Sequence, residues 1–581
     1  MLFSTHVFSQ DSADPAEQKR LALEAQRILK ERCANCHNGQ KREGGRLSVE
    51  DYGVLTESVT GETYETFVKP GSLKESGIWD QVAVLREMPK NGNPLSEEEL
   101  STLRAWIEKG APSWETSRKI EFVSEQQQLK AIRDYLTDAE PRKIPQLRFF
   151  TLANIHNDPS YSERDLNLHR AALSKAVNAM SRAGAIIQPA AIDAQKTIYA
   201  FNISELGWQN DWSEVVKKYP YGLKPLNSKG NPEVRRIYDA IEKLYTSSGA
   251  VFDGVAAIRA DWFVARATRP DLYHRLSGTP TDLAEFFRQQ GIRDFGASFR
   301  EGTLKRAGMF RSGVSSQNRL VEVHRDGRVW MSYDFKRNNR DSNLSLRPLG
   351  PQKTPGNESF EQFAFQHDGG EVIYERDNGL HGYLLIGLDK DGKGVRINEG
   401  PVDIVYDVTQ VSGSPLIING LSCMSCHKAG LKDLSDDIRE GHSVQNQAAA
   451  EQVKLLYPPR EEMTRMIDKA NKKFQEALRD TIGSYFEEGQ DLMKLPEPIG
   501  YVAQNFDHNV TLQRAALELG MADVKELEYG LNGRQISQFG LAPLSQPNGS
   551  IKRGFWETND DIGASVFQHV ANLLSLGSPV N

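Results

Sequence analysis

The sequence predicts a mixed fold that is mainly α-helical and has a smaller antiparallel β part. Apolar residues recur at helical spacing over residues 15–37 and again over residues 448–488. From about residue 318 to residue 397 they alternate instead, and Asp-Gly and Asn-Gly pairs, which favour tight hairpin turns, separate the alternating runs. Because 581 residues exceed what one hydrophobic core usually spans, we expect about three or four domains.

The composition is that of a globular protein, with 39% hydrophobic and 26% charged residues. The formal net charge of −7 argues against nucleic acid as a main partner, because phosphate binding needs a basic surface. No apolar run approaches the roughly 18 to 20 residues that cross a bilayer, so we expect no transmembrane segment. The oligomeric state stays open.

The four cysteines form two copies of one pattern, "ERCANCHNGQ" at residues 31–40 and "LSCMSCHKAG" at residues 421–430. A c-type haem needs two thiols for its vinyl groups and an adjacent imidazole for its iron, so this pattern predicts two covalently bound haems. A four-cysteine zinc site is the main alternative, but it has no need of a His directly after both pairs. A thioredoxin-like redox pair is disfavoured, since no βαβ pattern surrounds either site. The predicted haem residues are Cys33, Cys36, His37, Cys423, Cys426 and His427.

Covalent haem attachment in bacteria takes place outside the cytoplasm, so we expect a periplasmic or otherwise exported protein. The beginning, "MLFSTHVFSQDSADPAEQ", has no basic segment and only a short, interrupted apolar stretch, unlike an intact signal peptide. We therefore interpret residues 1–19 as a signal remnant or a disordered N-terminus.

The first haem segment is predicted to form an all-α domain over residues 20–114. A helix leads directly into the first cysteine pair, and a second helix starts after Ser96 with acidic residues in its first turn and stops at Gly110. Between them, Met88-Pro89 lies about 50 residues after His37. A thioether suits the sixth coordination position of a low-spin haem iron and raises its reduction potential, although many Met residues only fill a core.

The order of these motifs (CxxCH, "PG", "MP", then "LRAWIEKGA") resembles the planctomycete-type cytochrome c domain. That resemblance implies an all-α cytochrome c fold, with His37 and Met88 as the two axial ligands of the first haem.

Residues 115–145 are charged and Gln-rich and are expected to form a linker helix and turn, followed by an α+β middle domain over residues 146–415. Several segments resemble large bacterial proteins that carry planctomycete-type cytochrome domains, which implies a dihaem architecture but no particular reaction. They are "LRFFTLANIHND", "AAIDAQKTIYAFNISELGW", "IRADWFVARATRPDLYHRL", "RAGMFRSGVSSQNRLVEVH", "HDGGEVIYERDNGLHGYLLI" and "NGLSCMSCHKAG".

Residues 416–581 are expected to form a helical domain with the second haem, His427 being its proximal ligand and a helix break falling at Pro458-Pro459. No "MP" segment follows this site, so the sixth position of its iron is either open or filled from elsewhere. The candidate sixth ligands or distal groups are His367, Met463 and His442, then Met466 and His508. The candidate catalytic residues are His367, Asp368 and Glu371, which could move protons beside an open iron.

Three functions remain open at this stage. The first is a dihaem redox protein in which a His/Met haem relays electrons to or from a second haem that reacts with peroxide, oxygen or another small molecule. The second is a pure electron-transfer protein with two six-coordinate haems. Both imply a redox partner protein. The third is a binding or sensor protein whose middle domain recognises a polymer or partner, with exposed aromatic residues such as Trp208, Trp212, Trp262 and Trp330.

Overall fold

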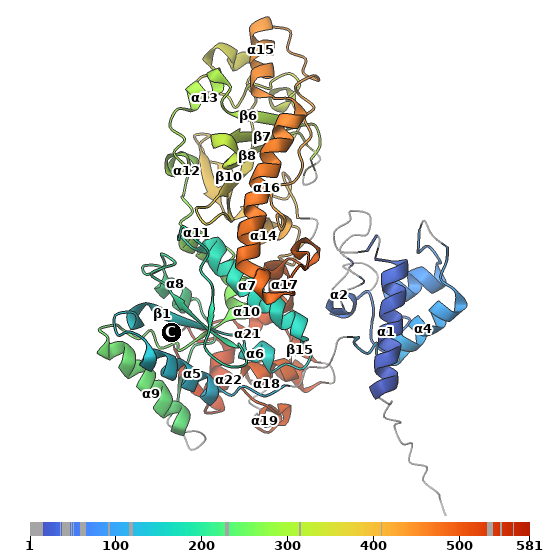
Figure 1. Ribbon diagram of the computed structural model, residues 1–581, viewed down its shortest axis with the longest axis vertical. Coiled ribbons are helices and arrows are strands. Elements are labelled where there is room, and N and C mark those ends of the chain that lie inside the picture. Colours follow the sequence, from blue (N-terminus) through green and yellow to red (C-terminus); the bar gives the residue numbers. More distant parts are fainter. Residues whose placement is uncertain are drawn as a thin grey trace, which may run out of the picture. The chain divides into compact units, whose positions relative to one another are not determined.

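The computed structural model divides into two compact units, Met1–Arg118 and Lys119–Asn581 (Figure 1). It describes residues 15–34, 36–37, 47, 49, 52–57, 66–90, 93–114, 120–226, 232–312, 315, 317–407, 410–530, 538–546, 549–561 and 563–580. Within these residues, none of the helices is both long and apolar enough to span a membrane. Of the predicted N-terminal segment 1–19, residues 1–14 lie outside the described residues, and residues 15–19 are already helical.

The described elements of the first unit are helices: α1 (Pro15–Arg32), α2 (Tyr52–Glu57), α3 (Gly77–Trp79), the π-helical turn η2 (Asp80–Val84) and α4 (Glu97–Glu108). The predicted start of α4 is confirmed, because the Ser96 side chain accepts from the Glu99 amide and the Glu99 carboxylate accepts from the Ser96 amide. The core of the unit gathers around Leu29, Trp106 and Ile107 from α1 and α4.

The second unit begins with α5 (Glu125–Asp138), in the segment that was expected to be a linker. This helix buries Leu129, Ile132 and Leu136 in one core cluster with residues of α9 (Pro232–Ser247), so it belongs to the folded body. Next to it lies a small sheet of order β2-β3-β1-β5, with strands β1 (Leu147–Thr151), β2 (Ala190–Ala191), β3 (Ile198–Asn202) and β5 (Ile258–Arg259). Two helices of this region matter below, α7 (Glu163–Met180) and α10 (Ala260–Ala267).

The predicted antiparallel β part is a six-stranded sheet, in which consecutive strands are neighbours. The hairpin turn at Asp326-Gly327 is confirmed, as are the Asn-Gly and Asp-Gly turns that follow. The strands are β6 (Lys305–Met309), β7 (Arg319–His324), β8 (Val329–Asp334), β9 (Gly369–Glu375), β10 (His381–Leu388) and β11 (Gly394–Ile397).

Because side chains alternate along a strand, the two faces of this sheet carry different residues. One face, the α16 face, packs its odd-numbered β7 residues Val321 and Val323, with Trp330 of β8, against the long helix α16 (Arg460–Ile482) (Figure 1). The other, the opposite face, packs Leu320 and Tyr333 into a separate cluster with Phe286, Phe365 and their neighbours.

The C-terminal helices are α14 (Leu421–Cys426), α15 (Gln447–Leu456), α16, α17 (Pro498–Asp507), α18 (Leu512–Glu518), α19 (Val524–Gly530), α21 (Arg553–Trp556) and α22 (Val566–Leu573). The predicted break at Pro458-Pro459 falls between α15 and α16.

The expected domain boundary at residues 415/416 is corrected by the structure. Leu173 of α7 and Phe263 of α10 share one core cluster with Val502 of α17. A buried ion pair of 2.7 Å joins Lys175 Nζ of α7 to Glu497 Oε1, just before α17. The middle and C-terminal segments therefore share one core cluster, and the segment with the second cysteine pair is built into the middle region.

Candidate functional site

The second CxxCH sequence forms the short helix α14 and the residue that ends it. Cys423 is buried in the shared core, Cys426 is half-buried, and the His427 amide donates to the Cys423 carbonyl at 2.9 Å. Burial raises the pKa of both thiols, and the negative charge of Glu371 adds to both shifts. Both cysteines are therefore protonated thiols without a disulfide, the state available for addition to haem vinyl groups.

The imidazole of His427 is held in one tautomer. Its Nδ1 lies 3.0 Å from the Gly430 carbonyl oxygen, which can only accept, so Nδ1 carries the proton and Nε2 keeps its lone pair. Burial, together with the charges of Lys432 and Arg319, lowers the pKa of His427 to about 4. A neutral imidazole with Nδ1–H bonded to a carbonyl and Nε2 available is the form that ligates a metal. These residues thus fit a covalently attached haem.

The loop after His427 is fastened to α16. The Asn471 side chain accepts from the Leu431 amide at 2.7 Å and donates to the Leu431 carbonyl at 2.9 Å, and Gln475 donates to the Ala429 carbonyl at 3.0 Å. Gly430 has φ +107°, and a Cβ there would lie 2.3 Å from Asn471 Oδ1. The acceptor of the His427 proton is thereby fixed in place, and with it the direction of the ring.

Two aromatic side chains of β10 lie beside His427. The Tyr383 ring is 6.1 Å from the His427 ring, and the buried His381 ring stacks on Phe474 of α16 at 4.3 Å. Burial lowers the pKa of His381 to about 3, with the charge of His427 adding to the shift, and its buried Nδ1 has no hydrogen-bond partner among the described residues. His381 was not predicted from the sequence, although strand alternation places it on the same face as Tyr383.

A buried ionic cluster lies on the α16 face at the ends of β7, β8 and β9. Arg319 Nε donates to Asp334 at 2.7 Å, and Arg319 Nη2 donates to Glu371 at 2.8 Å, to Asp334 at 3.1 Å and to the Ser332 hydroxyl at 3.2 Å. Its charges reach the predicted haem residues: the Glu371 carboxylate raises the pKa of both cysteine thiols, and the Arg319 guanidinium lowers the pKa of His427. Arg319 was missed by the sequence analysis. The sequence pattern that could have indicated Arg319 is its alternation with Val321 and Val323, which places all three side chains on the same inward face of the strand.

The three residues proposed together as catalytic are separated by the sheet. Glu371 lies in the cluster just described, on the α16 face. His367 packs its ring 5.0 Å from that of Tyr333, on the opposite face, and Asp368 is exposed and accepts from the Lys336 amide at 2.8 Å. Since His427 approaches Tyr383 from the α16 face, the sheet separates His367 from it, and of the three residues only Glu371 lies on the same face as His427.

The other candidate sixth ligands also fall into different surroundings. Met463 is buried on α16 against Trp330, on the same face as His427, and Met466 lies half-buried in the same cluster. His442 accepts from the Val444 amide at 3.2 Å, and Val444 packs on the opposite face. His508 ends α17, where burial and the nearby Arg514 lower its pKa to about 4. Of these candidates, Met463 and Met466 share the α16 face with His427.

The first CxxCH sequence directly follows α1. The His37 amide donates to the Cys33 carbonyl at 2.9 Å, and the His37 carbonyl accepts from Val49 at 3.0 Å. Burial raises the pKa of Cys33 to about 11. Met88 is half-buried and packs against the same core cluster as Cys33, so both predicted haem-contacting residues border one core.

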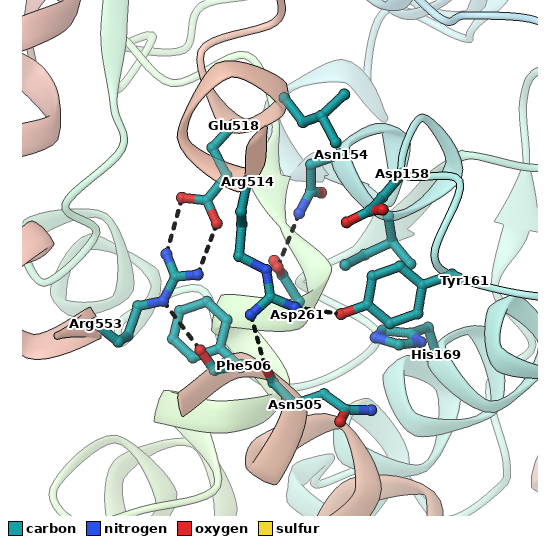
Figure 2. Close-up of a pocket in the computed structure, with 12 residues that line it drawn as sticks. Asn154, Asp158, Tyr161, His169, Asp261, Asn505, Phe506, Arg514, Glu518 and Arg553 are labelled. Carbon is teal, nitrogen blue, oxygen red and sulfur yellow. Dashed lines mark hydrogen bonds and ion pairs between the residues drawn. The ribbon is translucent and has the colours of Figure 1, made fainter. Parts of the chain in front are cut away.

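A second polar feature of the large unit is a cavity between α6 (Ala153–His156), α7, α10 and the helices α17, α18 and α21 (Figure 2). Its charges neutralise one another in a chain: Asp261 pairs with Arg259 at 2.6 Å, Arg259 with Glu518 at 2.9 Å, and Glu518 with Arg553 at 2.8 Å. Arg514 donates to the Tyr161 hydroxyl at 2.7 Å. The remaining space holds about one water molecule, which leaves no room for a larger ligand. The ion pairs of this cavity therefore connect the middle segment to the C-terminal segment.

The tryptophans proposed for a polymer-binding surface are core residues instead. Trp208, Trp212, Trp262 and Trp330 are all buried, so these four side chains do not line an exposed binding surface. Among the described residues, no group of three or more His, Cys, Asp or Glu side chains is arranged to hold a metal ion. No family model, no curated protein and no solved structure matches this chain.

Proposed function

We propose that the protein is an exported dihaem c-type cytochrome, in which a first haem relays electrons to or from a second haem, where a small molecule reacts. The observation that carries this is His427: a neutral, half-buried imidazole directly after one buried and one half-buried thiol, with Nδ1–H held by the Gly430 carbonyl and Nε2 left for iron. A surface histidine beside two chance cysteines has no need of that arrangement.

Haem, when bound, supplies an iron that changes oxidation state and can hold an exchangeable ligand. The chain supplies everything else. Cys423 and Cys426 would anchor the group, His427 Nε2 would ligate it, and the Gly430 carbonyl would keep the imidazole basic by accepting a hydrogen bond from Nδ1–H. In the first unit, Cys33, Cys36 and His37 would play the same parts, and Met88 would supply the thioether that raises the reduction potential.

The reaction at the second haem is supported by the cluster around Glu371 and Arg319. Burying ionic groups costs free energy, and these groups lie among apolar residues of the α16 face. That cost favours a functional role for them beside the proposed haem. A carboxylate and a guanidinium can move a proton and stabilise developing charge on a reacting oxygen.

Pure electron transfer is the second candidate, and the position of Met463 and Met466 favours it. Both lie on the α16 face in one cluster with Trp330, so a thioether from α16 could close the second iron. Electron transfer between two six-coordinate haems would then be the function.

Two measurements test these proposals. Mass spectrometry of protein matured in the periplasm is expected to show two covalent haems, and fewer than two would refute the dihaem proposal. Low-temperature EPR of the oxidised protein then separates the candidates. A high-spin ferric signal of about half the haem supports a reaction site, whereas two low-spin signals support electron transfer.

A further inference from the structure

Arg319 and Glu371 each have one polar atom that forms no hydrogen bond with a described residue. Arg319 is 9% exposed, and its Nε and Nη2 are fully engaged, but its Nη1 has no hydrogen-bond partner among the described residues. The Oε2 atom of Glu371 accepts a hydrogen bond from Arg319, whereas its Oε1 atom has no hydrogen-bond partner among the described residues. Neither atom is among the buried polar atoms that lack a partner, so both face space that solvent reaches, where a ligand could bind them.

The hydrogen bonds around Arg319 and Glu371 fix the positions of Nη1 and Oε1. Asp334 grips Arg319 through both carboxylate oxygens, at 2.7 and 3.1 Å, and the Ser332 hydroxyl links Asp334 at 2.8 Å to the Glu371 amide at 2.9 Å. Three neighbouring strands therefore hold one donor, Nη1, and one acceptor, Oε1, in a fixed relation. Such preorganisation suits binding and catalysis better than a pair on flexible loops.

We propose that Arg319 Nη1 and Glu371 Oε1 form the binding and proton-transfer pair for a hydroperoxide at the second haem. This inference rests on the function proposed above. The pair offers one donor and one acceptor, and a hydroperoxide offers an oxygen that accepts and an O–H that donates. Dioxygen has no proton for Glu371, so the pair distinguishes the two.

The charge of the cluster argues against a carboxylate as the occupant, including a haem propionate. Asp334 and Glu371 already oppose the single positive charge of Arg319, within 2.7 and 2.8 Å. A third carboxylate would add repulsion in a buried place, whereas an uncharged oxygen ligand adds a hydrogen bond without adding charge.

The reaction balances as follows. The O–O bond of the hydroperoxide breaks, and the products are one alcohol (or water, from hydrogen peroxide) and one water molecule. Glu371 Oε1 takes the proton from the bound oxygen and returns it to the departing one, and Arg319 Nη1 stabilises the charge that develops as the bond breaks. Two electrons from a one-electron donor protein and two protons from solvent complete the reduction.

The test uses full-length protein loaded with both haems, and two probes. Hydrogen cyanide, an uncharged acid that must lose a proton on binding ferric iron, reports the pair without turnover; hydrogen peroxide reports the reaction. Glu371→Gln and Arg319→Lys are each expected to lower cyanide affinity at one haem about tenfold, the effect of losing one charge-assisted hydrogen bond, and to slow oxidation by peroxide. Arg306→Lys is the matched control, because Arg306 is also buried, on the neighbouring strand, but pairs with Glu322 at 2.6 Å on the opposite face of the sheet.

Each outcome of this test either supports or overturns the proposal. A loss in both variants but not in the control supports the proposal. Unchanged cyanide affinity in both variants overturns it, and so does a shifted reduction potential with unchanged affinity, which would indicate a propionate at Arg319. An equal loss in the control also overturns it. If the wild type carries two haems but binds no cyanide, the inference fails while the dihaem proposal stands; fewer than two haems would refute the proposed function itself.

Discussion

Replacing Asn471 by Leu would loosen the support of His427 while keeping the volume of the side chain. The change removes two hydrogen bonds, of 2.7 and 2.9 Å, and leaves the amide and carbonyl of Leu431 without their partner. Each group left unsatisfied costs about 1–3 kcal/mol when buried, and this loop is only half-buried, so we expect a loss of about 2 kcal/mol.

The same change should act on the second haem alone. Without Asn471, the Gly430 carbonyl no longer holds the His427 proton firmly, so the imidazole becomes a weaker base and stabilises ferric iron less. The reduction potential of the second haem should therefore rise, and that of the first haem should stay constant. Urea unfolding followed by circular dichroism measures the stability, and a spectroscopic redox titration measures the two potentials.

The matched control for this variant is Lys473→Met on the same helix. Lys473 pairs with Glu375 at 2.6 Å, but its side chain is 54% exposed, and such pairs contribute little. We expect a change within about 1 kcal/mol and no change in either potential. The reasoning about His427 is refuted if Asn471→Leu changes the unfolding free energy by less than about 0.5 kcal/mol and leaves the second potential where it was.

Three further predictions follow from the same structure. Burial alone would raise the pKa of Glu322, but the charge and hydrogen bonds of Arg306 and His324 lower it to about 2 from 4.5, which corresponds to about 3 kcal/mol of stability. Because the pKa is depressed, that stability is present above about pH 4.5 and is lost as the pH falls toward 2; urea midpoints across this range should show the loss in wild type, and a Glu322→Gln variant with the same slope would contradict it. Met88→Ala should lower the reduction potential of the first haem by removing the thioether, and an unchanged potential in a redox titration would exclude Met88 as a ligand. Cys423→Ser should leave one thioether at the second haem, so that mild extraction or mass spectrometry finds that haem more readily lost than in wild type; equal retention would contradict the attachment there.

The local patterns of the sequence predicted elements well where backbone chemistry decides. The cap at Ser96, the Asp326-Gly327 hairpin and the helix break at Pro458-Pro459 all depend on residues within a few positions, and all three are confirmed. The α16 face and the opposite face also follow from alternation along the strands.

Long-range packing could not be predicted in the same way. Alternation alone would place His367 and Glu371, which are four residues apart, on the same face of a strand. The bend at Asp368 that puts them on different sides of the sheet leaves no periodic signal. The contribution of α5 to the core of the second unit depends on α9, about a hundred residues later. Arg319 was overlooked because a single charge in a strand usually points to solvent, and only its partners on β8 and β9 show that it is buried.

The pairing of β16 (Gly577–Pro579) with β4 (Leu223–Pro225) has a consequence for how the molecule matures. Residues 577–579 pair with residues 223–225, so the large unit can complete its fold only after nearly the whole chain has been synthesised or exported. Until then its core is incomplete. If Cys423 carries a haem as proposed, an attachment enzyme would have to reach it before the core closes around it. Cofactor loading at the second site would therefore precede closure, and a chain that closes first would be trapped in an empty form.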